Sequence, residues 1–264
     1  MNYNIIKYIK KLNKKPSVQR RLLEHFIAQG ASTIPEMSKG IGVSLPTATH
    51  ALNELIKGGL VKEIGKKDNS PGRIPMVYDL MPNAGYFVGV NPEMDCLAFA
   101  ASDFCGNLIT KKIKVPYVYR NTPENLERLG EIINEFIAGL PISKEEILQV
   151  CVNVAERVNP FEGKAYNMFT FLENPLAEKL TELIQLPVCI ENDTRSMAFA
   201  EFCKGCCKGL KDVIFVNICW GLGIGIIIDG KLYYGKSGYS GEFGHMTAYN
   251  NNIICHCGKI GCIE

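Results

Sequence analysis

The sequence predicts an α/β protein that carries a small, basic helical module at its N-terminus. Three observations favour this fold class: apolar residues at helical spacing over residues 17–57, a run of short strands from residue 86, and alternating helices and strands after residue 122. The chain has 264 residues and is 47% apolar, which is enough for one large core or two ordinary ones. We therefore divide it into residues 1–80 and 81–264.

The N-terminal part is predicted to form three helices followed by a β-ribbon. The helices cover residues 17–29, 34–39 (with Pro35 in the first turn) and 44–57 (capped by Ser44), and the ribbon strands cover residues 60–64 and 76–80. In the third helix, Ala48, Leu52, Leu55 and Ile56 should face the core. Helix, helix, glycine turn, helix and ribbon is the order of a winged helix-turn-helix, whose third helix enters the major groove of DNA.

Charge is distributed unevenly along the chain. Residues 1–80 contain 13 Lys/Arg and 6 Asp/Glu, a balance of +7, whereas residues 81–264 contain 16 and 21, a balance of −5. A basic module on a mildly acidic body favours a front end that meets double-stranded DNA. A protein-interaction module with a solvated basic face is the alternative. The candidate DNA-binding residues lie on the third helix and the ribbon: Ser44, Thr47, Thr49, His50, Lys66, Lys67 and Arg73.

The body is predicted to be a meander followed by alternating helices and strands, which indicates a mixed sheet. Strands are expected over residues 86–90, 96–101, 108–115, 147–154, 187–190, 213–219 and 223–229, and helices over 122–138, 175–184 and from residue 193 onward. No apolar run approaches the ~20 residues that a membrane helix needs.

The chain has 11 cysteines and shows no signal peptide, so we expect a protein of the reducing cytoplasm. Cys96, Cys151, Cys189 and Cys219 lie in apolar segments and are interpreted as small buried side chains.

The last two dozen residues contain one histidine and three cysteines with the spacing H-x9-C-x-C-x4-C: His245, Cys255, Cys257 and Cys262. This set predicts a closed, structural zinc site. Reduced thiols without a metal are the alternative, and His256 is the rival nitrogen ligand. Glu242 and Glu264 flank the motif, and carboxylates that each accept two hydroxyl protons suit a polyhydroxyl ligand.

Asn192 and Asp193 follow a predicted strand and open a helix. Ligands bind at such strand ends in α/β sheets, so both residues are candidate ligand contacts. An ordinary pair of helix-capping residues is the alternative.

The motifs Glu191-Asn192-Asp193, Gly221-x-Gly223-x-Gly225, Gly241–His245 and Cys255–Glu264, with the N-terminal module, closely resemble the ROK family of repressors, open reading frames and sugar kinases. The resemblance implies a ribonuclease-H-like, actin/hexokinase-type fold with two lobes, residues 81–191 and 192–264. It implies structural zinc and a sugar or sugar phosphate between the lobes. The implied sugar contacts are Asn192, Asp193, Glu242, His245 and Glu264.

Departures from the kinase pattern favour a repressor of carbohydrate-utilisation genes. The expected phosphate loops read Val90-Asn91-Pro92-Glu93-Met94 and Cys219-Trp220-Gly221, without the glycines and hydroxyl that would bind a phosphate. Asp193, at the position of the kinases' general base, then becomes a vestige that accepts a sugar hydroxyl. An active ROK sugar kinase with a fused DNA-binding domain, and a scaffold that binds no effector, are the alternatives.

In the family, further residues follow the position of Glu264, complete the second lobe and contribute to dimerisation. We therefore expect an incomplete second lobe in this chain, uncovered apolar faces on the strands between residues 213 and 235, and a homodimer or higher oligomer for the full-length form. Arg157 and Arg195 are the nearby candidates for contacting a phosphate.

Overall fold

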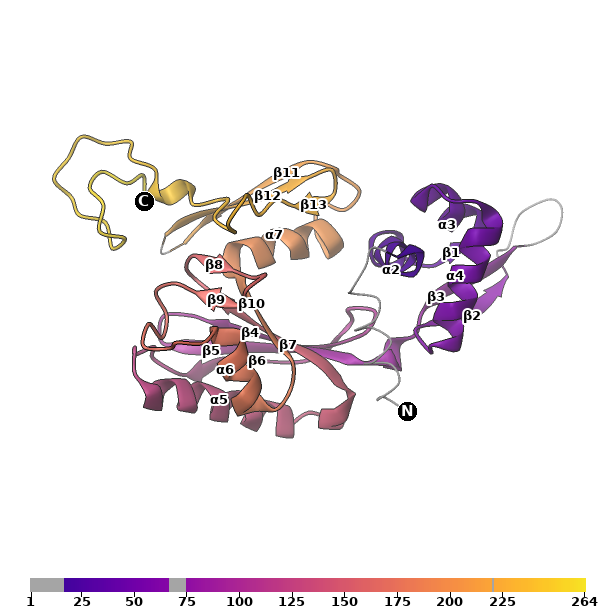
Figure 1. Cartoon of the computed structure of the whole chain (residues 1–264), viewed down its shortest axis with the longest axis horizontal. Coiled ribbons are helices and arrows are strands. Elements are labelled where there is room, and N and C mark those ends of the chain that lie inside the picture. The colour runs from indigo at the N-terminus through magenta and orange to yellow at the C-terminus, as the bar shows by residue number, and fades with distance from the viewer. Residues whose placement is uncertain (1–16, 67–74, 220) are drawn as a thin grey trace. The chain divides into compact units, whose positions relative to one another are not determined.

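The computed structural model describes residues 17–66, 75–219 and 221–264, and the chain divides into two compact units (Figure 1). The first unit comprises the described residues up to Phe87 together with residues 101–110 and 141–148, and the second comprises the rest. The predicted mixed α/β class is confirmed. No helix within the described ranges is long and apolar enough to span a membrane.

The first unit contains the expected helices and strands. The helices are α2 (Val18–Gln29), α3 (Ile34–Ile41) and α4 (Leu45–Lys57), and an antiparallel sheet has the order β1 (Ser32–Thr33), β3 (Met76–Leu80), β2 (Val61–Lys66). Ser17 and Ser44 cap α2 and α4, because each side chain accepts a hydrogen bond from a backbone amide in the first turn. A short 3-10 turn, Pro82–Ala84, follows β3.

Three details differ from the predicted elements. α3 runs to Ile41, because the first residue to take the left-handed conformation that ends a helix is Gly42, with φ 63°. β1 was not predicted, since two residues carry no periodicity. Ile56 is 37% exposed and Ala51 is buried in its place, because the buried stripe of α4 follows residues 48, 51, 52 and 55.

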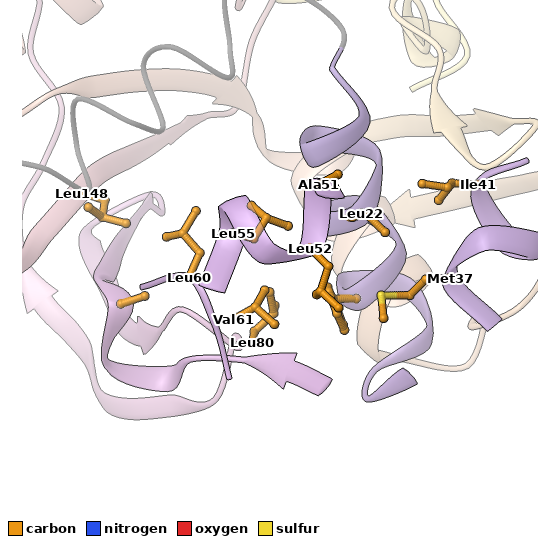
Figure 2. Packing of buried hydrophobic residues seen from close by; sticks show 12 residues of the cluster. Leu22, Met37, Ile41, Ala51, Leu52, Leu55, Leu60, Val61, Leu80 and Leu148 are labelled. Atoms are coloured by element: carbon orange, nitrogen blue, oxygen red, sulfur yellow. The ribbon is translucent and has the colours of Figure 1, made fainter. Parts of the chain in front are cut away.

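All three helices and the sheet contribute to one apolar cluster (Figure 2). α2 supplies Leu22 and Phe26, α3 supplies Met37 and Ile41, α4 supplies Ala51, Leu52 and Leu55, and Leu60, Val61, Leu80, Ala84 and Leu148 complete the cluster. Burial of such side chains stabilises a fold by about 1.5–3 kcal/mol each, so this cluster fixes the three helices and the ribbon relative to one another.

The central sheet of the body has the strand order β10-β7-β4-β5-β6. Its strands are β4 (Tyr86–Pro92), β5 (Cys96–Asp103), β6 (Leu108–Pro116), β7 (Ile147–Val154) and β10 (Val188–Asn192), and β10 pairs with β7 in parallel. α5 (Pro123–Ala138) and α6 (Leu176–Ile184) pack against each other on one side of this sheet (Figure 1). A 3-10 turn, Lys144–Glu146, precedes β7, and a small hairpin of β8 (Val158–Asn159) and β9 (Lys164–Ala165) follows it.

The C-terminal part consists of α7 (Asp193–Lys204), the antiparallel sheet β11 (Val213–Ile218), β12 (Leu222–Ile228) and β13 (Lys231–Leu232), and a loop with a 3-10 turn at Phe243–His245. α7 packs closely on β12: a Cβ on Gly225 would lie 2.3 Å from the Cβ of Ala198. The other face of the sheet is exposed, as expected. Ile214, Val216 and Ile218 are 70%, 50% and 81% exposed.

The interpretation of the four apolar-segment cysteines is correct in part. Cys96 is buried and Cys151 and Cys189 are partly buried, but Cys219 is exposed. Cys219 lies just beyond the end of β11 at Ile218, so it has left the sheet.

Candidate metal and ligand site

The four predicted metal ligands converge on one point. One side-chain donor atom from each of His245, Cys255, Cys257 and Cys262 lies within 4.8 Å of the others. The loop between them is held by two isolated β-bridges, Thr247 to Cys262 and Ile254 to Ile260.

The distances among these atoms fit a tetrahedral zinc ion. Zinc–thiolate and zinc–imidazole bonds of usual length place two sulfurs about 3.8 Å apart, and a sulfur and a nitrogen about 3.6 Å apart, at the tetrahedral angle. The Sγ atoms of Cys257 and Cys262 are 3.7 Å apart, and Cys255 Sγ is 3.6 Å from His245 Nδ1. The residues therefore suit a structural zinc ion, which would bind through Nδ1 of His245.

A second set of donors shares part of this cluster. His245 and Cys255 also lie within 4.8 Å of His256 and Glu264. Three sulfurs and one nitrogen make the better zinc site, because thiolates are preferred structural ligands and His256 is far more exposed, at 74% of its side chain. His256 therefore lies close enough to be the nitrogen ligand, but the donor set that contains it makes the weaker zinc site.

Glu264 is anchored inside the loop. Its Oε1 lies 3.3 Å from His245 Nδ1 and 3.1 Å from His256 Nδ1, and its Oε2 accepts a hydrogen bond from the Leu222 amide at 3.3 Å. The side chain is only 12% exposed. Gly244 makes room for it, since a Cβ there would lie 2.8 Å from Oε2 and 2.3 Å from the Leu222 carbonyl oxygen.

A cavity of about 460 Å³ lies beside the loop, within the size range of small-molecule sites. Its lining residues are Arg157, Tyr239, Glu242, His245, Met246, Thr247, Cys257 and Lys259. Burial raises the pKa of Glu242, against the lowering effect of His245 and two arginines. Of the predicted sugar contacts, Glu242 and His245 line this cavity, and Glu264 lines a neighbouring one of about 210 Å³.

Asn192 and Asp193 line neither of these two cavities. Asn192 caps α7: its Oδ1 accepts from the Arg195 amide at 3.0 Å and its Nδ2 donates to the Glu156 carbonyl oxygen at 3.2 Å. Asp193 Oδ1 accepts from the Thr194 amide at 2.6 Å. Burial raises the pKa of Asp193. The Asn192 side chain is therefore a helix cap, which was the alternative to a ligand contact. Asp193 Oδ2, by contrast, makes no hydrogen bond with the described residues.

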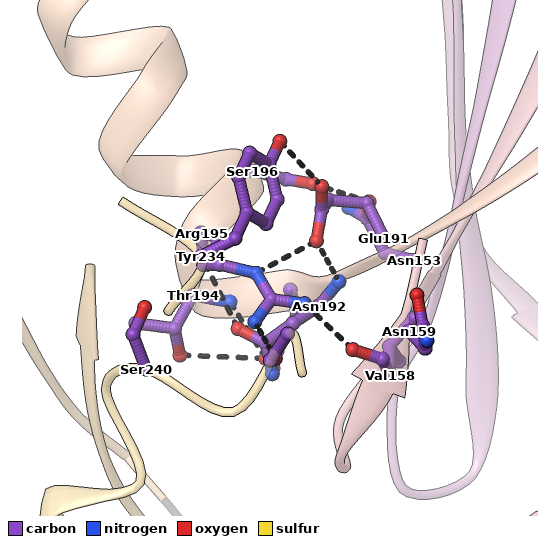
Figure 3. Close-up of polar contacts among 12 residues, drawn as sticks. Asn153, Val158, Asn159, Glu191, Asn192, Thr194, Arg195, Ser196, Tyr234 and Ser240 are labelled. Carbon is purple, nitrogen blue, oxygen red and sulfur yellow. Dashed lines mark hydrogen bonds and ion pairs between the residues drawn. The ribbon is translucent and has the colours of Figure 1, made fainter. Parts of the chain in front are cut away.

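Arg195 is the centre of a buried network (Figure 3). The sequence indicated it only as a candidate phosphate contact. Its Nε donates to Glu191 Oε1 at 2.8 Å, its Nη2 donates to the Val158 carbonyl oxygen at 3.2 Å, and its Nη1 donates to the carbonyl oxygen of Gly238. The guanidinium also lies 5.3 Å from the ring centre of Tyr234, whose hydroxyl donates to Glu191 Oε2.

This network leaves Arg195 only 2% exposed, so its guanidinium is shielded from any phosphate in solution, and that expectation is wrong. Instead it ties the start of α7 to β8 and to the segment that leads into Gly241–His245. The signal in the sequence was the spacing of Glu191 and Arg195, four residues apart across a helix start.

Some of the candidate DNA-binding side chains form hydrogen bonds within the protein, and others are exposed. The hydroxyls of Ser44 and Thr47 bond to each other at 2.8 Å, and Thr49 donates to the Leu45 carbonyl oxygen at 2.8 Å. His50 and Lys66 are exposed. Lys67 and Arg73 lie outside the described residues.

The segment where the resemblance implies the first kinase phosphate loop lies at the end of β4 and just after it. There the Asn91 side chain accepts a hydrogen bond from Asn153 at 3.1 Å, and Glu93 accepts one from Cys96 Sγ at 3.3 Å. Trp220, in the second loop, lies outside the described residues.

Comparison with curated proteins links the chain to both branches implied by its motifs. It is 30% identical over 259 residues to the xylose repressor of Bacillus subtilis, a match that covers 97% of this chain and 66% of the repressor. It is 33% identical over 182 residues to a glucokinase of Streptomyces coelicolor, covering 68% of this chain and 55% of the kinase. The chain thus spans just under two thirds of the xylose repressor's length.

Solved structures give the same picture of the fold. The chain matches a ROK family transcriptional regulator, described as a homologue of the E. coli MLC protein, with a TM-score of 0.70 and 24% identity over 92% of this chain and 62% of that one. The sequence model of the ROK family matches residues 96–264. On these matches, and on the motifs that carry them, the chain belongs to the ROK family, on the side of its repressors.

Proposed function

We propose that this protein is a sugar-responsive, DNA-binding transcriptional regulator that represses carbohydrate-utilisation genes and whose kinase-like domain binds a sugar without phosphorylating it. One observation carries the proposal. The match to a xylose repressor covers 97% of the chain and so includes the N-terminal module, whereas the match to a glucokinase covers 68%. A kinase needs no such module.

In this proposal the N-terminal part, residues 1–80, is a winged helix-turn-helix. α3 and α4 form the helix-turn-helix, and the β2–β3 ribbon is the wing. His50 and Asn53 lie on the exposed face of α4 and would reach base edges, while Lys57 and Lys66 would contact phosphates. The hydroxyls of Ser44, Thr47 and Thr49 are already bonded within the protein, so they would add less. Lys67 and Arg73 stay proposed as wing contacts.

The sugar would bind beside the metal loop. Glu242 can accept hydroxyl protons in the cavity that it shares with His245. Asn192, Asp193 and Glu264 stay proposed as further sugar contacts, although none of the three lines this cavity. Zinc bound by His245 and the three cysteines would hold the loop, and with it Glu264, in one geometry. Removing the metal would therefore weaken sugar binding without any direct contact between metal and sugar.

Binding of the sugar would change operator affinity by favouring one arrangement of paired DNA-binding units over another. This requires a homodimer or a higher oligomer, whose symmetry would be matched by paired half-sites in the operator.

A ROK sugar kinase is the second candidate, supported by the glucokinase match and by Asp193 at the general-base position. Exposed Glu93 and the hydrogen-bonded Asn91 at the first phosphate loop oppose it, because a carboxylate repels a phosphate and no glycine amides line that strand end. A scaffold that represses without an effector is the third.

A mobility-shift assay with DNA from upstream of the protein's own gene, at low salt, tests the main proposal. We expect a retarded complex that a sugar from a monosaccharide panel dissolves. Absence of any complex would refute DNA-binding regulation, and retention of the complex with every sugar would favour the scaffold. A coupled ATPase assay over the same panel tests the kinase: turnover that is lost in Asp193→Asn would establish it.

A further inference from the structure

The exposed face of α4 begins with apolar side chains and becomes polar only further along the helix. It consists of residues that follow one another at helical spacing and are all exposed: Pro46, His50, Asn53 and Lys57. Leu45 precedes Pro46 in the first turn and is 50% exposed. Single exposed apolar residues are common on protein surfaces, so what this pair can do depends on the groups around it.

The hydroxyl groups around this apolar pair are largely used within the helix. Ser44 Oγ and Thr47 Oγ1 lie 2.8 Å apart and share a hydrogen bond. Thr49 Oγ1 donates to the Leu45 carbonyl oxygen at 2.8 Å. Two of the three hydroxyl protons are therefore spent inside the protein. Pro46 has no backbone N–H, which removes a further donor. The side chains at the start of α4 thus offer a partner mainly apolar surface.

The composition of α4 limits which base edges it can recognise. Residues 45–53 contain no Arg, Lys or Gln, so no side chain there can contact guanine in the way that Arg and Lys do. His50 and Asn53 are the side chains of this stretch that carry nitrogen donors. The major-groove feature that an apolar side chain recognises is the 5-methyl group of thymine. The balance of +7 over residues 1–80 makes DNA the partner that suits this face.

We propose that Leu45 and Pro46 are specificity-determining residues, which recognise the operator by contact with the 5-methyl groups of thymine in the major groove. This inference rests on the proposed function, since it names what the DNA-binding part recognises. A recognition helix contacts base edges with residues near its beginning, and both residues lie in the first turn of α4. Burial of one methyl group against apolar surface corresponds to about fourfold in affinity.

Base analogues test the contact without changing base pairing. Footprinting narrows the DNA from upstream of the protein's own gene to the protected segment, and each thymine of that segment is replaced in turn by deoxyuridine, which lacks only the 5-methyl group. Fluorescence anisotropy then measures the affinity of the whole chain. We expect a loss of about fourfold at the thymines that face α4 and less than about twofold elsewhere. At a sensitive position, a 5-methylcytosine–guanine pair should bind more tightly than a cytosine–guanine pair.

Variants assign the effect to the two residues. Leu45→Ala and Pro46→Ala should each reduce the loss caused by deoxyuridine, and the double variant should bind thymine and deoxyuridine equally. Both positions lie outside the apolar cluster of the first unit, so the variants should fold. Leu210→Ala changes a leucine that is 54% exposed and lies outside residues 1–80, and it should keep the full difference. The slope of affinity against salt should be the same in all variants, because no phosphate contact is removed.

Two results would overturn the inference and leave the proposed function intact, because unmodified DNA is still bound in both. One is that deoxyuridine costs no affinity at any thymine of the protected segment. The other is that its cost stays the same in the double variant, which would assign the methyl contact to another side chain. If unmodified DNA is not bound even at low salt, the proposed function fails and this inference fails with it.

Discussion

Arg195 and Glu191 form a buried ion pair, with Arg195 Nε donating to Glu191 Oε1 over 2.8 Å and side chains only 2% and 14% exposed. The pair spans the junction between β10 and α7, and the other donors of Arg195 hold Val158 and Gly238. The segment that carries Gly238 leads directly into Glu242 and His245. The position of the candidate site therefore depends on an arginine that does not line the cavity.

Removing this arginine should destabilise the protein strongly. Arg195→Met leaves Glu191 buried without its partner, and breaking a buried pair in this way costs about 3–5 kcal/mol. The measurement is the free energy of unfolding from urea titration. Arg128→Met is the matched control, because Arg128 pairs with Glu131 and Glu135 at the surface and exposed pairs contribute about 0–1 kcal/mol. Equal losses in the two variants would contradict the network's importance.

Zinc should bind with a stoichiometry of one per chain and should stabilise the loop. Cys262→Ser removes one ligand and should lower both the metal content measured by plasma mass spectrometry and the melting temperature. Cys206→Ser changes an exposed cysteine outside the cluster and should change neither. Full metal content in Cys262→Ser would point to the alternative donor set with His256 and Glu264.

Gly244 should tolerate no side chain. An added Cβ would meet the Leu222 carbonyl oxygen at 2.3 Å and Glu264 Oε2 at 2.8 Å. Gly244→Ala should therefore cost about 1–3 kcal/mol of stability, the range for overpacking, and should weaken sugar binding through Glu264. Gly139→Ala serves as control, since its nearest neighbour would be 3.5 Å away. Wild-type affinity in Gly244→Ala would show that Glu264 does not help to bind the sugar.

Asp193 should make stability depend on pH. Burial raises its pKa in the folded state, so the folded protein holds the proton more tightly than the unfolded chain. The stability that this provides is fully present below the unfolded pKa near 3.8 and is lost as pH rises through the raised folded pKa. Asp193→Asn removes the effect, so its stability relative to wild type should increase with pH across that window in urea titrations. A difference that does not vary with pH would mean that burial does not perturb this carboxyl.

The sequence predicts most elements well where local signals agree. α5 begins where the Thr122 cap and Pro123 indicate, because capping chemistry is local. The prediction that Ile56 faces the core is wrong. Adjacent residues of a helix point in different directions, and only the packing of the folded chain decides which of these directions is buried. β1 exists only through its pairing with β3 and has no pattern of its own.

The candidate site shows the same division between local and non-local information. Ligand spacing alone indicated the metal cluster, since the cysteines lie close together in sequence. The spacing of Glu191 and Arg195 could indicate their ion pair, but the contacts of Arg195 with Val158 and Gly238 could not be predicted, because these partners lie 37 and 43 residues away. The cavity that joins Arg157 to Lys259 is likewise a product of the fold.

The central claim is that the protein binds operator DNA under the control of a sugar. Its most direct test is fluorescence anisotropy of labelled DNA from upstream of the protein's own gene, titrated with the whole chain at several salt concentrations. We predict tighter binding than to a scrambled sequence, a steep loss of affinity with salt, and release on adding the sugar that the mobility-shift assay identifies. Equal affinity for scrambled DNA, or no binding at low salt, would contradict the account.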